Sequence, residues 1–346
     1  MSNELSLMIS VVIPAHNAAH TLGETLQAIA RSDYADFEVV VVDDASTDGT
    51  GRVAAEQGCR VVTLPQNVGA AQAKNLGVGM ASGDIILFTD ADIVLREDTL
   101  GRVAQHLQDD SLAGVVGLLG QRLRFANFSS QFKNLWMHYT YTRLAAIQSS
   151  EHGVGVFFTS IAAIRKPVFL QMGGFDSHYR GASITEDIEF GQRLLTAGHR
   201  VRIDGQLWVE HLKYYSLQDL LRTDFRRAFG LTKTLLRKKV EADQRAAGQK
   251  YYASVPWFFA LGIPLSWLMP ALVLLAVVVR RPWWAWAGGA AYLSLLLVNA
   301  PFLWALYRAR GWFFLLQSCL FLPVDLWVSG LGSLWAMIDY LRGNRY

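Results

Sequence analysis

Cysteine is scarce in this sequence, which holds only Cys59 and Cys319 among 346 residues. One lies in the polar first part and the other in the apolar last part, so neither a disulfide framework nor a zinc site is indicated. A basic N-terminus is also missing, because Met1 to Met8 contains Glu4 and no Lys or Arg. The apolar run Ile9 to Ala15 that follows is too short for the core of a signal peptide. We therefore expect no cleaved leader and a head that stays in the cytoplasm.

Charge is distributed unevenly along the chain. Residues 1–212 carry 16 Lys and Arg against 23 Asp and Glu, whereas residues 213–254 carry 10 against 4. An acidic head followed by a basic segment, which in turn precedes apolar sequence, is typical of a chain that meets an anionic membrane face. Nucleic acid is a poor alternative partner, because the basic residues are not spread over the head.

Three long apolar runs follow the basic segment, at residues 255–279, 282–307 and 312–338. Each exceeds the roughly 20 residues that a helix needs to cross a bilayer. Arginine lies at their boundaries and tryptophan near their ends, as in membrane spans. We expect three spans in the inner or cytoplasmic membrane, with the head inside and the C-terminus outside. Asp325, in the last run, is either a functional intramembrane carboxylate or part of a re-entrant hairpin broken near Pro323.

Short runs rich in Val and Ile alternate with segments of helical period through the head. The predicted strands are residues 9–15, 37–43, 60–64, 85–89, 113–123, 156–165 and 207–210. The predicted helices are residues 19–31, 48–57, 70–81 and 97–107. This alternation is typical of an α/β fold, in which a mostly parallel sheet has helices on both faces. Such sheets bind ligands at the carboxyl ends of their strands, so the acids that follow residues 42 and 89 are expected to face one ligand.

Two segments allow more than one interpretation. Aromatic and apolar residues recur at helical spacing from 125 to 139, and they form either core or an acceptor-side lid that faces lipid. Residues 216–240 combine an apolar face with basic residues, which favours an amphipathic helix in the headgroup layer, although a surface helix docked on the sheet is the alternative. The residues expected at the acceptor and membrane interface are Trp136, Arg222, Arg226 and Arg227.

Five short motifs occur in a fixed order through the head. They are Ser10-Val-Val-Ile-Pro-Ala-His-Asn17, Val41-Val-Asp-Asp-Ala-Ser-Thr-Asp-Gly-Thr50, Thr89-Asp-Ala-Asp92, Gly173-Gly-Phe-Asp176 and Thr185-Glu-Asp187. Together they resemble the family-2 glycosyltransferases of the GT-A fold. We therefore divide the chain into a GT-A nucleotide-sugar-binding domain at 1–212, an amphipathic basic interfacial segment at 213–254 and a transmembrane domain at 255–341.

The resemblance assigns the first two motifs to the nucleoside of a nucleotide-sugar donor. The turn that contains Pro14, Ala15 and Asn17 would hold the nucleoside. Asp43 and Asp44 would accept a hydrogen bond from an N–H of uracil or guanine, which an ionised acid pairs with well. One of the two acids could instead cap the helix that follows them.

The resemblance assigns the next residues to the diphosphate and a metal ion. Lys74 and Asn75 look like the family's basic-Asn element beside the diphosphate, where a Lys offsets the charge of the leaving group. A lone helical Lys would otherwise be a solvated surface residue. Asp90 and Asp92 match the D-x-D motif, with Asp92 as the main ligand of Mg²⁺ or Mn²⁺ and Asp90 shared between ribose and metal. His211 resembles the histidine that some GT-A enzymes add to the metal shell, although a lone His is more often structural.

Glu186 and Asp187 open a predicted helix, and Ser183 and Glu186 are spaced as a capping box. The helix dipole favours the ionised form of a carboxylate at this position. By resemblance, Asp187 is the general base that deprotonates the acceptor hydroxyl, and direct attack would invert the anomeric configuration. The alternative is a pair of acids that only favours a helix start.

The leading hypothesis is an inverting, metal-dependent transfer of one sugar from a UDP- or GDP-linked donor to a lipid or lipid-linked acceptor. Processive polysaccharide synthases of similar layout carry (Gln/Arg)-x-x-Arg-Trp on the interfacial helix, and residues 222–230 lack it. A membrane transport or assembly subunit that only binds nucleotide sugar would not need the pair Glu186-Asp187.

Overall fold

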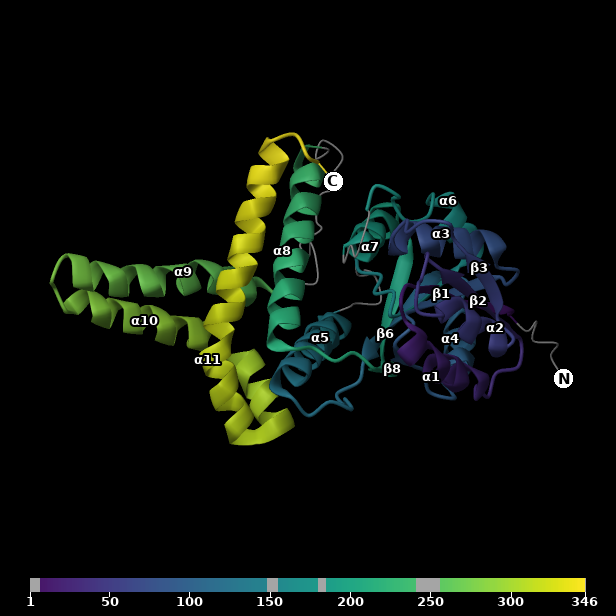
Figure 1. Ribbon diagram of the computed structural model, residues 1–346, viewed down its shortest axis with the longest axis horizontal. Coiled ribbons are helices and arrows are strands. Elements are labelled where there is room, and N and C mark those ends of the chain that lie inside the picture. Colours follow the sequence, from purple (N-terminus) through teal and green to yellow (C-terminus); the bar gives the residue numbers. More distant parts are fainter. Residues whose placement is uncertain (1–6, 148–154, 180–184, 241–255, 346) are drawn as a thin grey trace. The chain divides into compact units, whose positions relative to one another are not determined.

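The computed structural model describes residues 7–147, 155–179, 185–240 and 256–345, and Figure 1 presents its helices and strands. They fall into two compact units. Unit 1 comprises residues 7–124 and 141–213 of the described chain, and unit 2 comprises residues 125–140, 214–240 and 256–345.

Unit 1 is built on an eight-stranded sheet in the order β3-β2-β1-β4-β7-β6-β8-β5. The strands β1 to β4 are parallel, β7 is antiparallel to both β4 and β6, β8 is parallel to β6, and β5 is antiparallel to β8. The predicted parallel arrangement is thus confirmed for the first four strands and interrupted by β7. The strands are β1 (Ile9–Ala15), β2 (Phe37–Asp43), β3 (Arg60–Thr63), β4 (Ile85–Thr89), β5 (Ile93–Val94), β6 (Leu112–Leu119), β7 (Ile161–Arg165) and β8 (Arg200–His211).

Helices cover the central strands of this sheet so closely that every residue of β4 is buried, as its unbroken apolar sequence predicts. The closest approach is that of α3 to β1 and β2. A Cβ atom on Gly77 of α3 would collide with the side chain of Val12 and press on that of Val42, so only glycine fits there. The helices of this unit are α1 (Ala19–Ala30), α2 (Thr50–Glu56), α3 (Ala70–Met80), α4 (Thr99–His106), α6 (Lys166–Gln171) and α7 (Glu186–Thr196).

Unit 2 is helical. It contains the first part of α5 (Phe128–Ile147) together with α8 (Leu217–Val240), α9 (Trp257–Val278), α10 (Trp283–Val298) and α11 (Ala300–Leu341). Within this unit α8 packs along α11, and α9 lies beside α10 (Figure 1). By length and composition α9 and α11 could each cross a membrane, whereas α10, with 16 residues, is shorter.

The helix boundaries differ from the three predicted spans. The second predicted span is divided at Asn299, which ends α10 and precedes α11, and Pro301 lies in the first turn of α11, where its missing N–H is tolerated. One residue inside α11, Gly311, is non-helical, with φ 80° and ψ −171°. Since α11 continues through Pro323, the interpretation as a hairpin broken near that residue is wrong. Asp325 lies buried in the same helix.

The aromatic stripe of α5 forms core in unit 2. The ring of Phe128 lies 5.1 Å from that of Phe314, and the ring of Phe132 lies 5.7 Å from that of Phe302, both measured between centroids. Phe132 and Trp136 are buried. Of the two interpretations of this stripe, packing inward is therefore confirmed.

Candidate active site

The carboxyl ends of β1 and β2 lie side by side, because Ala15 pairs with Asp43 in the parallel register. Pro14 and Ala15 are the last residues of β1, as the prediction required. The turns that follow both strands contain a non-glycine residue with left-handed backbone, Asn17 with φ 51° and Ala45 with φ 58°. Such strained positions cluster at ligand sites, where surrounding structure holds them in place.

These two turns are joined by hydrogen bonds. The backbone N–H of Asn17 donates to the Ser46 hydroxyl at 3.0 Å, and the backbone N–H of Thr47 donates to Oδ1 of Asn17 at 2.9 Å. The Asn17 side chain therefore fixes the second turn relative to the first. The position of a ligand bound to one of these turns would therefore depend on the conformation of both.

Asp43 and Asp44 are adjacent in the sequence but have different hydrogen-bond partners. Both are buried. Oδ1 of Asp43 accepts the backbone N–H of Ser46 at 3.0 Å. The two carboxylate oxygens of Asp44 accept the backbone N–H groups of Val68 and Gly69, at 2.7 and 2.9 Å, just before α3 begins. The start of α2 is served by Asp48, whose carboxylate accepts a backbone N–H at 3.1 Å. Neither member of the pair is therefore needed to cap α2.

Asp90 and Asp92 lie beyond the end of β4, at the same edge of the sheet. The Ser160 hydroxyl donates to Oδ2 of Asp90 at 2.5 Å. Oδ2 of Asp92 lies 3.3 Å from Nε2 of His211, because β5 pairs with the end of β8 in a register that sets His211 opposite Ile93. The structure thus brings together Asp92 and His211, two of the three predicted metal ligands, and joins Asp90 to Ser160.

The Asp92 and His211 side chains fit a shared divalent ion. Two neighbouring ligands of one octahedral ion, each at about 2.1 Å from it, lie about 3 Å apart, close to the separation observed. Burial alone would raise the pKa of Asp92, but His211 and Lys213 lower it. Within the part of the chain that the structure describes, no group of three or more His, Cys, Asp or Glu is close enough to hold a metal ion. An ion here would draw further ligands from the donor diphosphate.

Lys74 forms a buried ion pair with Glu186. Its ammonium lies 3.0 Å from Oε1 of Glu186 and donates to the Thr159 hydroxyl at 2.6 Å. The two residues of the pair are only 2% and 3% exposed, which excludes the alternative of a solvated surface lysine. Burial would lower the pKa of Lys74, but Glu186, Asp90 and Asp187 together raise it, so the lysine is charged. The acids of two predicted motifs therefore surround one cation.

Asp187 is the second residue of α7 and is half-buried, in contrast to Glu186. Its Oδ1 accepts the backbone N–H of Ile188 at 2.7 Å. The predicted capping box does not start this helix, because Thr185 is the N-cap and Glu186 is the first helical residue rather than the third. Ser183 lies outside the described residues.

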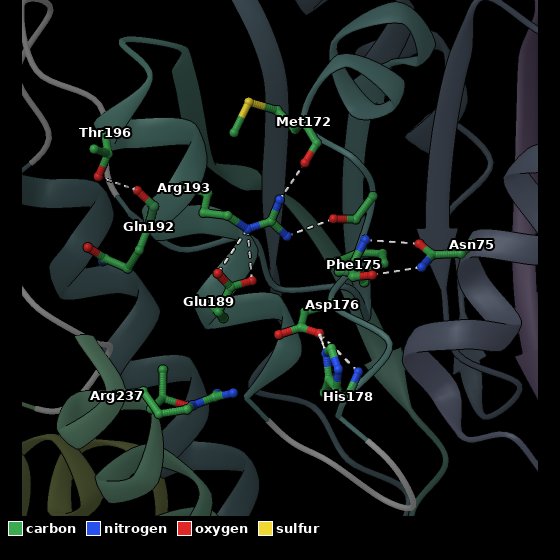
Figure 2. A network of polar contacts seen from close by, with 12 residues as sticks. Asn75, Met172, Phe175, Asp176, His178, Glu189, Gln192, Arg193, Thr196 and Arg237 are labelled. Carbon is green, nitrogen blue, oxygen red and sulfur yellow. Dashed lines mark hydrogen bonds and ion pairs between the residues drawn. The ribbon is translucent and has the colours of Figure 1, made fainter. Parts of the chain in front are cut away.

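The remaining predicted donor residue, Asn75, bonds to the protein backbone. Figure 2 shows its side chain paired with Phe175, donating to the carbonyl at 2.7 Å and accepting the backbone N–H at 2.9 Å. From the other side, the Arg193 guanidinium of α7 donates to the carbonyls of Met172 and Gly174, at 2.5 and 2.7 Å. The Gly-Gly-Phe-Asp motif is thus held between α3 and α7.

The four residues expected at the acceptor and membrane interface separate into two groups. Arg222 and Arg226 are exposed on α8. Arg227 and Trp136 are buried in unit 2, where the guanidinium lies 4.5 Å from the ring centroid. Only the first two are therefore placed to meet an external surface.

Thr159 and Ser160 are site residues that the sequence analysis missed. They directly precede β7, and each hydroxyl contacts a predicted functional residue, Lys74 or Asp90. No motif marks them. The direction of β7 brings its first residues to this edge, where Ile161 pairs with Thr89, and a strand's direction is not readable from its own sequence.

Comparison with known proteins found similarity to one described family. Residues 10–172 match the family described as Glycosyl transferase family 2. The chain is 30% identical over 141 residues to the glycosyltransferase GlyG of Streptococcus pneumoniae, which is 39% of this chain and 45% of that protein. It is 34% identical over 119 residues to an N-acetylglucosaminyltransferase of Mesorhizobium japonicum, which is 32% of this chain and 28% of that protein. The chain thus spans less than half the length of these two relatives.

One solved structure shares the fold over almost the whole chain. It is the mannosyltransferase PcManGT of Pyrobaculum calidifontis in complex with GDP-Man and Mn²⁺, with a TM-score of 0.59 and 20% sequence identity. The superposition covers 96% of this chain and 88% of that one. The GT-A expectation for the fold is thereby confirmed.

Proposed function

We propose that this chain, which belongs to family 2 of the glycosyltransferases, moves a single sugar from a nucleotide-sugar donor to a lipid or lipid-linked acceptor at a membrane surface. The observation that carries the proposal is the convergence at one edge of the sheet. There Glu186 pairs with Lys74, and Asp90 and Asp187 act electrostatically on the same ammonium. An enzyme that transfers sugar needs a diphosphate site and a base within reach of each other, and this convergence supports such an arrangement.

The donor would bind along the ends of β1, β2 and β4. The joined turns that contain Asn17 and Ala45 suit the nucleoside. Both oxygens of Asp44 accept backbone N–H groups, whereas Asp43 accepts the Ser46 N–H with Oδ1, so Asp43 is the better candidate for reading the base through its other oxygen. A divalent ion held by Asp92 and His211, with Asp90 beside it, would neutralise the diphosphate as it leaves. The related structure contains GDP-Man and Mn²⁺, which supports a donor of this class and an ion of this kind.

Asp187 is the proposed general base. It is partly exposed and lies at the N-terminus of α7, where the helix dipole keeps a carboxylate ionised at neutral pH. In this role it accepts the proton of the acceptor hydroxyl while that oxygen attacks the anomeric carbon. Attack opposite the leaving diphosphate inverts the configuration of that carbon.

A membrane acceptor is supported by unit 2. The helices α9 and α11 are long and apolar enough to span a bilayer, and they expose large apolar side chains such as Leu274 and Leu320. The exposed Arg222 and Arg226 of α8 would contact anionic headgroups, each at a gain of ~1 kcal/mol. We place the head in the cytoplasm, where nucleotide sugars are made.

The deciding experiment is a panel of UDP- and GDP-sugars incubated with the purified full chain, Mg²⁺ or Mn²⁺ and membrane lipid extract. Acceptor-dependent release of nucleoside diphosphate, together with a lipid heavier by one sugar in the mass spectrum, is the expected result. A ladder of lengthening products would indicate a polymerase instead. Donor binding without any release would indicate a subunit that only binds nucleotide sugar.

The lipid acceptor is tested by charge reversal on α8. The Arg222→Glu and Arg226→Glu double variant should bind anionic vesicles about tenfold or more weakly and glycosylate lipid correspondingly slowly. Its affinity for UDP or GDP should be unchanged. Arg52→Glu, which reverses an exposed arginine of the head, is the matched control and should leave vesicle binding intact. Equal vesicle binding by the double variant and the control would contradict a membrane contact through α8.

A further inference from the structure

Two consecutive residues of α3 hold two different segments that follow β7 in the chain. Lys74 pairs with Glu186 in the first turn of α7, and Asn75 forms two hydrogen bonds with the backbone of Phe175. A Cβ atom at Gly174 would lie 2.7 Å from Oδ1 of Asn75, so the glycine is what permits this close pairing. Both residues were expected beside the diphosphate. In the structure both side chains instead bond to other parts of the protein.

The ammonium of Lys74 is enclosed. Two of its three N–H donors are directed at Glu186 and Thr159, and the ring of Phe175 lies 5.3 Å away. Phe175 is itself packed against the rings of four other buried phenylalanines, which fixes its position. A lysine with 2% exposure in this setting is poorly placed to reach out to a mobile diphosphate.

Glu186 is equally unsuited to act as the base. Its Oε1 accepts from Lys74, and its Oε2 is buried without a hydrogen-bond partner among the residues that the structure describes. An acceptor hydroxyl would have to enter the protein interior to reach either oxygen. Asp187, the next residue, is half-buried and therefore the accessible one of the two.

The same contacts extend to the metal side of the site. Thr159, which accepts from Lys74, is followed by Ser160, which donates to Asp90. The main chain between these two hydroxyls spans only one peptide unit. A displacement of Lys74 would therefore move both the first turn of α7 and the Ser160 hydroxyl beside Asp90.

We propose that Lys74 and Glu186 are positioning residues, in which a buried ion pair anchors the first turn of α7 on α3 and so presents Asp187 to the acceptor at a fixed distance from the donor. Lys74 is then not a diphosphate ligand, and Glu186 is not the base. Asn75 performs the same task for the turn that ends at Phe175. The assignment rests on the proposed function for the part that concerns Asp187, whereas the anchoring itself is independent of it.

A double-mutant cycle separates this role from direct contact with the donor. The variants are Lys74→Met, Glu186→Gln and the two combined, each keeping nearly the original shape of the side chain. Lys166→Met, which removes a lysine of the same unit that donates to the Ala81 carbonyl, is the matched control. Three quantities are measured on the full chain: the affinity for UDP and GDP with Mg²⁺, hydrogen exchange of the α7 amides, and turnover on membrane lipid extract.

Either single variant leaves one buried charge without its partner, so we expect α7 amides to exchange at least about tenfold faster. Turnover should fall by about 10² through misplacement of Asp187, with nucleoside diphosphate affinity within about threefold of wild type. The combined variant has no unpaired charge, and it should recover most of the exchange protection and at least about tenfold of the turnover. The control variant should change none of the three.

The opposite pattern would overturn the proposal. If Lys74→Met weakens UDP and GDP binding more than about tenfold while α7 exchange stays unchanged, and the combined variant is no better, Lys74 is a diphosphate ligand. A failure of the proposed function looks different, because wild type itself would then release no nucleoside diphosphate. The exchange measurements would still decide whether the pair anchors α7.

Discussion

Replacing Asp187 by Asn is expected to abolish most transfer while leaving the donor site intact. The amide keeps the shape of the side chain and its contact with the Ile188 N–H, but it cannot accept a proton from the acceptor. A general base contributes roughly 10² to 10⁴ in rate, which corresponds to about 3 to 5 kcal/mol of the barrier. The lost charge at the start of α7 costs only about 0.3 to 1 kcal/mol of stability. Misfolding therefore does not account for a loss of that size.

The measurement compares acceptor-dependent release of nucleoside diphosphate with calorimetric binding of UDP and GDP. Glu189→Gln provides the matched control, because it removes the same charge from the same helical turn and leaves Asp187 in place. Glu189 pairs with Arg193, so this variant should lose some thermal stability and retain turnover within a few fold. Near-normal turnover of the Asp187 variant would refute its role as base. Equal losses in both variants would mean that the charge of the turn matters and that no proton is accepted there.

Three further outcomes follow from the fold and the metal side of the site. Asp92→Ala should weaken nucleotide binding and lower turnover together. EDTA should abolish the turnover of the wild-type protein until Mg²⁺ or Mn²⁺ is added back. In thermal melts Gly77→Ala should cost about 1 to 3 kcal/mol through its collision with β1, whereas Gly79→Ala on the same helix, with open space around it, should be neutral or slightly stabilising. Hydrogen bonding from His106 lowers the pKa of Asp204, so that this carboxylate stabilises the fold above the usual Asp value near 4 and the stabilisation is lost as pH falls through the lowered pKa. Asp204→Asn should therefore melt below wild type near pH 6 and converge with it once the pH lies below the lowered pKa of Asp204.

The elements of the first half could be predicted from sequence because their signals are local. The boundaries of β1, β2 and β4 coincide with the runs expected, and α1 and α3 end within one residue of their predicted limits. Each run is short, apolar and followed by a helix of clear period, so nothing distant is needed to define it. Asp43, Asp44, Asp90 and Asp92 were found for the same reason, since they lie at the ends of these runs, whereas Asp187 was assigned by resemblance.

The remaining features depend on contacts between distant segments. The pairing of Lys74 with Glu186 joins residues 112 positions apart, and no local pattern distinguishes a buried helical lysine from a solvated one. Asp44 could not be separated from Asp43 until its contacts with Val68 and Gly69 were known. Likewise, α5 has the spacing of a core helix, but its sequence does not say that its first part packs in unit 2.

The reversed direction of β7 determines from which side the chain reaches the ligand edge of the sheet. The neighbouring strands β4 and β6 end at the ligand edge, so the residues that follow them lie there. The antiparallel strand β7 begins at this edge, so the residues that precede it lie there instead. The strand pairing fixes Ile161, and with it Thr159 and Ser160, and the buried side chains of Val156, Phe157 and Phe158 pack in the core just before them. The chain that follows Arg165 leaves β7 at the opposite edge, but it contains Phe175, Glu186 and Asp187, so changes there would affect the site. Grafting of alternative segments from related enzymes should therefore join this chain before Gly155, so that the buried residues 155–158 and both hydroxyls are retained.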